Sequence, residues 1–164
     1  MRKYILPFII IIVFLLSCED QIPHNNIPNS PVSFNLMINS RDNILKNGLA
    51  YKTFTENDRQ LDSDRFGYGG LLVVTDNTGN SIYAYDLACP YEGKKDIKVA
   101  YIDVGKVKCN ECGSVFITIY GDNIPGRGMV GFGSAESGPA AKERISLKSY
   151  NVLPLQYGEF RIFN

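Results

Sequence analysis

Short apolar stretches separated by turn residues are the feature that most constrains the fold of this chain. Residues 32–38 alternate apolar and polar side chains, which predicts a half-buried strand. Residues 69–87, GGLLVVTDNTGNSIYAYDL, place a DNTGN turn between two apolar runs and predict a β-hairpin. We find no convincing long amphipathic helix. Many short strands at regular spacing predict an all-β fold, an antiparallel β-sandwich or barrel.

Signals for secondary structure vary in strength along the rest of the chain. Residues 96–110 resemble a second hairpin, and residues 114–120 are rich in the β-branched and aromatic residues typical of strands. Two short strands are expected on either side of residues 156–158. Residues 40–66 show no clear period, and residues 121–138 are expected to form a glycine-rich loop.

The amino terminus, MRKYILPFIIIIVFLLSC, has the layout of a secretory signal peptide: a basic start, an apolar run and the small residue Ser17. The apolar run is about 13 residues long, whereas a membrane-spanning helix needs about 20, so we expect a cleaved leader. Leu15-Leu16-Ser17-Cys18 resembles the lipobox of bacterial lipoproteins. That resemblance implies that residues 1–18 are a lipoprotein signal peptide ending at a lipidated Cys18.

The residues that follow Cys18 bear on where the protein is anchored. Glu19 and Asp20 come next, and by analogy with lipoprotein sorting in some Gram-negative bacteria we expect the outer membrane, on its periplasmic face or at the cell surface. Residues 19–31, EDQIPHNNIPNSP, contain three prolines and three asparagines and are expected to form a flexible tether. This tether holds His24, the single histidine of the chain, and the folded domain is expected over residues 32–164.

The charge and the residue inventory argue against several classes of function. Lys+Arg and Asp+Glu are both 17, so no basic excess indicates a nucleic-acid partner. The expected domain has no histidine to activate a serine or cysteine, and the sequence therefore gives no support for hydrolytic catalysis. The G-x-G-x-x-G at residues 126–131 lacks the following helix of a nucleotide site, and we interpret it as a surface loop. The DNTGN segment lacks the distal glutamate of a calcium-binding EF-hand loop, and we interpret it as a hairpin turn.

The candidate chemistry lies in residues 87–116, which hold three of the four cysteines. The pattern is Cys89-x-Tyr91, 17 intervening residues, and then Cys109-x-x-Cys112-Gly-Ser-x-Phe. This pattern resembles a Rieske iron–sulfur domain, in which Cys-x-His and Cys-x-x-His motifs come from two neighbouring loops. Gly138-Pro139-Ala140 resembles the proline loop of that family, and the resemblance extends over about residues 66–164. It implies a Rieske-like β-domain with two cysteine-bearing loops.

The chain departs from that family at two ligand positions. In a Rieske centre two cysteines hold one iron and two histidines hold the other. Tyr91 and Cys112 stand where the histidines would be, and His24 cannot supply both missing imidazoles. A standard Rieske cluster within one chain is therefore excluded by counting, and only Cys89 and Cys109 carry over as family ligands.

Three interpretations of the thiols stay open. Sulfurs that share one iron in the family lie close together, so a Cys89–Cys109 disulfide would be sterically plausible, with Cys109–Cys112 as a competitor. Alternatively, the three thiolates bind zinc, or an altered 2Fe-2S cluster with Tyr91 as a further ligand. The third interpretation is that the cysteines are reduced, buried relics and Tyr91 is an aromatic residue packed beneath them.

We therefore expect a lipid-anchored envelope protein whose Rieske-like domain is a structural or binding module without a cofactor. The alternative is an electron-transfer or metal-binding protein with the altered ligands Cys89, Cys109 and Cys112. The expected partners are the membrane, through the lipid on Cys18, and an unidentified protein of the envelope.

Overall fold

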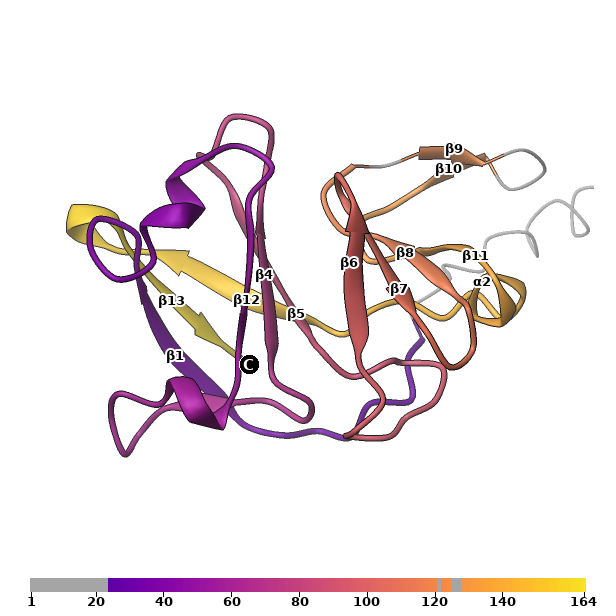
Figure 1. Cartoon of the computed structure of the whole chain (residues 1–164), viewed down its shortest axis with the longest axis horizontal. Coiled ribbons are helices and arrows are strands. Elements are labelled where there is room, and N and C mark those ends of the chain that lie inside the picture. Colours follow the sequence, from indigo (N-terminus) through magenta and orange to yellow (C-terminus); the bar gives the residue numbers. More distant parts are fainter. Residues whose placement is uncertain (1–23, 121, 125–127) are drawn as a thin grey trace, which may run out of the picture.

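The computed structural model describes residues 24–120, 122–124 and 128–164, and β-strands dominate these ranges (Figure 1). Among them, the larger sheet has seven strands, and each neighbouring pair is antiparallel. In the order in which they lie in the sheet, its strands are β2 (Tyr51–Phe54), β4 (Leu71–Thr75), β5 (Ile82–Asp86), β12 (Ser149–Pro154), β13 (Glu159–Phe163), β1 (Val32–Met37) and β3 (Arg65–Phe66).

A second antiparallel sheet packs beside the first one. Its strands lie in the order β11 (Ala135–Ser137), β8 (Val115–Ile117), β7 (Lys106–Cys109) and β6 (Val99–Asp103). The remaining elements are the hairpin of β9 (Asp122–Ile124) and β10 (Gly128–Val130) and the short helices η1 (Asn43–Lys46), η2 (Glu56–Asp58), α2 (Pro139–Lys142) and η3 (Gln156–Gly158). Within the described ranges, no helix has the length and apolar character needed to cross a membrane. The all-β, antiparallel expectation is confirmed.

The hairpins expected from local sequence are present. The DNTGN turn joins β4 to β5, and Asp76 Oδ1 accepts hydrogen bonds from the backbone N–H groups of Thr78 and Asn80 at 3.0 Å each. The turns from β6 to β7 and from β12 to β13 also lie where they were expected. The glycine-rich loop expectation was wrong in part, because residues 121–138 contain β9, β10 and β11; residues 125–127 lie outside the described ranges.

The central strand β4 explains why residues 71–74 form an unbroken apolar run. Leu71 and Val73 point into the core enclosed by the larger sheet, where Phe34 lies with its ring centroid 4.8 Å from that of Phe54. Leu72 and Val74 point the other way, into the core shared with the second sheet. A strand that is buried on both faces needs apolar side chains at successive positions.

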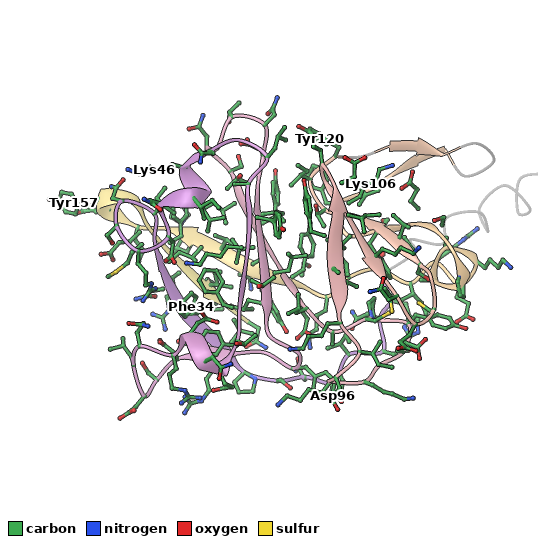
Figure 2. The ribbon with its side chains drawn as sticks, in the orientation of Figure 1. Phe34, Lys46, Asp96, Lys106, Tyr120 and Tyr157 are labelled. Carbon is green, nitrogen blue, oxygen red and sulfur yellow. The ribbon has the colours of Figure 1, made fainter. Side chains whose placement is uncertain are left out.

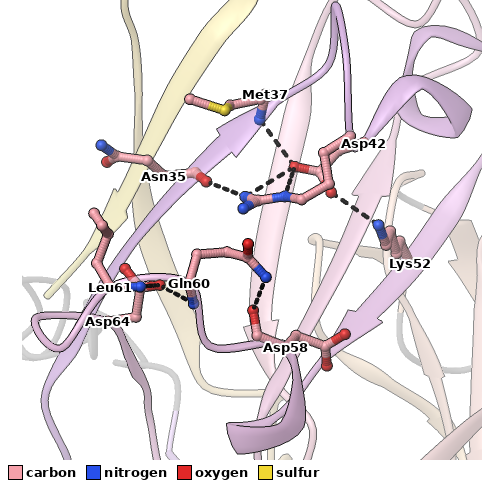
Figure 3. Close-up of polar contacts among 9 residues, drawn as sticks. Asn35, Met37, Asp42, Lys52, Asp58, Gln60, Leu61 and Asp64 are labelled. Atoms are coloured by element: carbon pink, nitrogen blue, oxygen red, sulfur yellow. Dashed lines mark hydrogen bonds and ion pairs between the residues drawn. The ribbon is translucent and has the colours of Figure 1, made fainter.

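Residues 40–66, which had no readable period, are held by two buried carboxylates (Figure 3). The Asp42 side chain accepts hydrogen bonds from Lys52 Nζ at 2.8 Å and from the backbone N–H of Met37 at 2.9 Å, and it forms an ion pair with Arg41. Burial would raise the pKa of Asp42, but these hydrogen bonds hold it below its usual value. Asp64 Oδ2 accepts the backbone N–H groups of residues 60 and 61, both at 2.9 Å. These acids support a segment made of short elements, η1, β2, η2 and β3, joined by turns.

The expectation of a flexible tether over residues 19–31 needs correction for residues 24–31. The carbonyl of His24 accepts a hydrogen bond from the backbone N–H of Ser146 at 2.9 Å, and the N–H of Asn26 donates to the carbonyl of Pro90 at 3.1 Å. Ile27 is 7% exposed. Burial of this apolar side chain and pairing of the backbone groups favour the docked segment over a free chain. Residues 1–23, with Cys18, lie outside the described ranges.

Candidate metal centre at the three cysteines

The fold brings together the three cysteines that the sequence analysis singled out. Cys89 follows β5, Cys109 is the last residue of β7, and Cys112 lies in the turn after it. All three sulfur atoms lie within 4.8 Å of one another, and the sulfurs of Cys89 and Cys112 are 3.8 Å apart. Cys89 and Cys109 are fully buried, whereas Cys112 is half-buried. Solvent can therefore reach the group from the Cys112 side.

The two cysteine loops share one local conformation. The carbonyl of Cys89 accepts a hydrogen bond from the backbone N–H of Gly93 at 3.0 Å, and the carbonyl of Cys109 accepts one from Gly113 at 2.9 Å. Gly93 and Gly113 have φ angles of 64° and 72°, a conformation that glycine adopts without strain. Both loops have the spacing Cys-x-x-x-Gly, a sequence signal that could have identified their shared conformation.

Backbone N–H groups in both loops are directed at the buried sulfurs. The N–H groups of Tyr91 and Glu92 hydrogen-bond to the sulfur of Cys89, and those of Glu111 and Cys112 hydrogen-bond to the sulfur of Cys109. Hydrogen bonds of this kind favour the charged thiolate over the neutral thiol. These hydrogen bonds partly offset the effect of burial on the two thiols, so the loops would assist ionisation of the sulfurs if a cation were bound beside them.

Burial and hydrogen bonding divide the three thiols into two classes. Burial raises the pKa of the Cys89 and Cys109 thiols above the usual value, despite the N–H groups directed at them. Burial would also raise the pKa of Cys112, but hydrogen bonds from the side chain and backbone of Ser114 bring it below the usual value. Cys112 is therefore the first of the three to ionise, and the other two need a nearby cation to do so.

The expected proline loop lies against the second cysteine loop. A Cβ on Gly138 would lie 2.6 Å from the Cα of Ser114, so only glycine permits this approach, and its φ angle is 83°. The backbone N–H of Ala140 donates to Ser114 Oγ at 3.1 Å, and that oxygen lies 3.2 Å from the sulfur of Cys112. Gly138, Pro139 and Ala140 thus position the serine that supports the Cys112 thiolate.

The structure places Tyr91 beside the thiols as a partly buried aromatic. It packs against the core cluster that contains Cys89 and Cys109. Its carbonyl accepts a hydrogen bond from Asn26 Nδ2 at 3.3 Å, which connects the docked amino-terminal segment to the first cysteine loop. These contacts agree with the simpler interpretation of Tyr91 as a packing residue.

A further residue that the sequence analysis missed is Asp86, three positions before Cys89. Its fully buried carboxylate accepts hydrogen bonds from the backbone N–H groups of Tyr68 at 2.8 Å, Gly69 at 3.0 Å and Ala88 at 2.8 Å, and from the hydroxyl of Tyr150 at 2.6 Å. This carboxylate fixes the backbone that leads into the first cysteine loop. No sequence signal distinguishes it from other acids at the ends of strands.

The disulfide expectation is not met in the structure, where Cys89, Cys109 and Cys112 are all free thiols. Among the described residues, the metal-ligating group consists of these three thiols and contains no carboxylate or imidazole. No protein-family model, curated protein or solved structure matches this chain. The resemblance to Rieske domains therefore stays a prediction.

Proposed function

We propose that this protein is a lipid-anchored envelope protein whose β-domain binds one thiophilic metal ion, zinc or iron, through Cys89, Cys109 and Cys112. The observation that carries the proposal is the convergence of three sulfur atoms within 4.8 Å of one another. Zinc–sulfur bonds are about 2.3 Å long, and tetrahedral bonds of that length place two sulfurs about 3.8 Å apart. The sulfurs of Cys89 and Cys112 are already 3.8 Å apart.

The close grouping favours a single ion over a two-iron cluster. In a two-iron cluster each iron binds its own protein ligands. The ligands of one iron are therefore separated from those of the other by the length of the cluster. Three sulfurs that all lie within 4.8 Å of one another suit ligands of one ion. Three protein ligands leave the fourth tetrahedral position to water or to an exchangeable ligand, and the half-buried Cys112 marks the side from which it can enter. Such an ion would supply the positive charge that the buried thiols need in order to ionise.

The cellular location in this proposal depends on the leader alone. A basic start, a short apolar run and Leu15-Leu16-Ser17-Cys18 support export and lipidation at Cys18. Multiple acyl chains would then hold the domain at the membrane, because one chain alone binds only marginally. The metal proposal and the anchoring proposal are independent, since each depends on different residues.

The test is metal content together with thiol count on protein that begins at Glu19. We expect about one zinc or iron ion per chain after purification in metal-supplemented medium, and three thiols that react slowly until a chelator is added. Replacing Cys112 with serine should remove most of the metal, because a two-thiolate site binds far more weakly. Replacing Tyr91 with phenylalanine is the matched control and should leave the metal content unchanged.

Three results would contradict the proposal of a single metal ion. Metal-free protein with one reactive thiol, rising to three after reduction, would indicate a disulfide-closed structural module. Metal-free protein with three freely reactive thiols would indicate reduced relics. Visible absorbance typical of a two-iron cluster would mean that the cysteines are metal ligands but that they do not bind a single ion.

A further inference from the structure

We propose that the cysteine end of the domain faces the membrane surface to which the chain is anchored, and that the docked amino-terminal segment, residues 24–29, fixes this orientation. The inference rests on the proposed lipidation of Cys18 and adds an interaction surface, whose partner is the lipid bilayer. It does not depend on whether the thiols hold a metal ion.

The docked segment joins the two parts of the molecule that surround the thiols. His24 forms a parallel β-bridge with Ile145, which follows α2. Two residues later, Asn26 hydrogen-bonds through its backbone N–H to Pro90 and through its side chain to Tyr91, both in the first cysteine loop. Asn26 also packs closely on Gly93, where a Cβ would lie 3.1 Å from its carbonyl oxygen.

The rest of the segment is fixed as well. Ile27 is buried, and the ammonium group of Lys148 donates to the carbonyl of Pro28 at 3.0 Å and to Asn29 Oδ1 at 3.1 Å. Contacts at five of the six positions from 24 to 29 leave little freedom between this segment and the domain. Of the described residues, His24 is the nearest in sequence to Cys18, and it is held at Ile145, two positions before Asn26 contacts the first cysteine loop.

The remaining length of chain restricts how far the domain can turn. Cys18 precedes His24 by six residues, which span at most about 22 Å when fully extended. A domain of this size is about 35–40 Å across. Without docking, fourteen residues would separate Cys18 from β1 and could span about 50 Å, enough for the domain to rotate freely. The docked segment shortens this reach to less than the width of the domain.

The charge distribution suits a surface of phosphate headgroups. Residues 89–98 and 139–148 include the contacts of the docked segment, and residues 108–113 form the second cysteine loop; together the three stretches carry seven basic and four acidic residues. The whole chain after Cys18 carries 15 basic and 17 acidic residues, so the excess of positive charge is confined to these three stretches, although Lys95 and Lys98 also line a pocket with residues 55–57 and 66–70. The basic residues are Lys94, Lys95, Lys98, Lys108, Lys142, Arg144 and Lys148, and the acidic ones are Glu92, Asp96, Glu111 and Glu143. Basic residues near a lipid anchor add attraction to anionic lipids.

The opposite end of the domain provides the internal reference for a test. Tyr157, at the tip of the β12–β13 hairpin, is 87% exposed and lies at the far end of the molecule from α2 (Figures 1 and 2). The side chain of Asn39 donates to its carbonyl, so the tip is held in place. A probe at residue 157 should therefore lie far from the bilayer if the cysteine end faces it.

The experiment uses the full chain, lipidated during expression and reconstituted into vesicles of phosphatidylethanolamine and phosphatidylglycerol. A genetically encoded fluorescent amino acid replaces either the exposed Asn110 in the second cysteine loop or Tyr157, which avoids thiol chemistry. A lipid with a nitroxide headgroup quenches the probe near the bilayer surface. We expect quenching at position 110 to be at least about twice that at position 157, given the width of the domain. Inserting about twelve Gly and Ser residues after Asp20 should reduce this difference, because it restores a reach longer than the domain and leaves only the attraction of the basic residues to favour this end.

The outcomes separate this inference from the proposed function. Lipidated protein with equal quenching at the two positions, or stronger quenching at 157, would overturn the orientation and leave the anchoring intact. A difference that the insertion does not reduce would show that attraction of the bilayer to this end sets the orientation alone, and would overturn the role given to residues 24–29. Protein whose mass shows no acyl chains would overturn both the anchoring and the orientation, while metal content, measured separately, would be unaffected.

Discussion

Replacing Asp86 with asparagine should destabilise the domain and loosen the first cysteine loop. One carboxylate oxygen, Oδ1, accepts the N–H groups of Gly69 and Ala88, and the other, Oδ2, accepts the N–H of Tyr68 and the hydroxyl of Tyr150. The side chain is fully buried, so water cannot replace a lost partner. Asparagine has the same shape but only one oxygen acceptor.

The size of the effect follows from the donors that would lose an acceptor. The least costly arrangement points the amide NH2 toward Tyr68 and Tyr150, because the Tyr150 hydroxyl can turn and accept while the N–H of Tyr68 cannot. One buried N–H is then left unpaired, at a cost of about 1–3 kcal/mol, and the bonds to the remaining oxygen lose the strengthening that a charged acceptor provides. After allowing for the lower desolvation cost of a neutral side chain, we expect a net loss of about 2–4 kcal/mol.

Urea and thermal unfolding, followed by circular dichroism, would measure this loss. A change of about 2–4 kcal/mol corresponds to a decrease in Tm of about 4–16 °C for a domain of this size. Replacing Tyr150 with phenylalanine removes one of the four hydrogen bonds and should cost less, about 1–2 kcal/mol. In the double variant the two losses should not add, because both act on the same carboxylate. The reaction rate of the Cys89 thiol should rise with Asp86→Asn, since Ala88 directly precedes it.

The reasoning would be refuted by Asp86→Asn protein whose free energy of unfolding and Cys89 reactivity match those of the unmodified protein. Such a result would mean that the backbone around the first cysteine loop is held by its core packing alone. Full additivity with Tyr150→Phe would also contradict the shared carboxylate.

Three other perturbations test separate parts of the structure. The pKa of Asp42 is lower in the folded than in the unfolded protein, so the ionised side chain stabilises the fold above the unfolded pKa of about 3.9, and this stabilisation is lost as the pH falls through the folded pKa. The free energy of unfolding should therefore decrease less between about pH 5 and pH 2 in Asp42→Asn than in the unmodified protein. Gly138→Ala would bring a Cβ within 2.6 Å of a backbone atom and should cost at least about 2 kcal/mol in chemical denaturation, whereas Gly131→Ala, with no atom within 4 Å, should change stability by less than about 0.5 kcal/mol. The rings of Tyr51 and Tyr101 stack with centroids 3.9 Å apart between β2 and β6, and a double-mutant cycle to alanine should give a coupling energy of about 0.5–1.5 kcal/mol.

Local patterns in the sequence were sufficient for the all-β class and for many of the strands and turns, but not for β2, β3, β9, β10 and β11. The alternation in β1, the apolar run of β4 and the DNTGN turn each depend on the chemistry of adjacent residues, so they can be read without knowing the rest of the chain. The spacing of Cys89, Cys109 and Cys112 likewise identified the candidate site, and the structure brings their sulfur atoms together although the two loops follow strands of different sheets, β5 and β7.

Contacts between distant residues determined what the sequence left open. Residues 40–66 have no period because buried carboxylates such as Asp42 and Asp64 hold them, and such bonds leave no repeating pattern. The distance of 3.8 Å between the sulfurs of Cys89 and Cys112 and the support of the first loop by Asp86 depend on strands that meet only in three dimensions. Residues 24–31 have the composition of a flexible linker, yet they dock, because the side chain of Ile27 is buried and backbone groups hydrogen-bond to residues more than 60 positions away. Composition describes a segment alone, whereas docking depends on the surface that the rest of the chain presents to it.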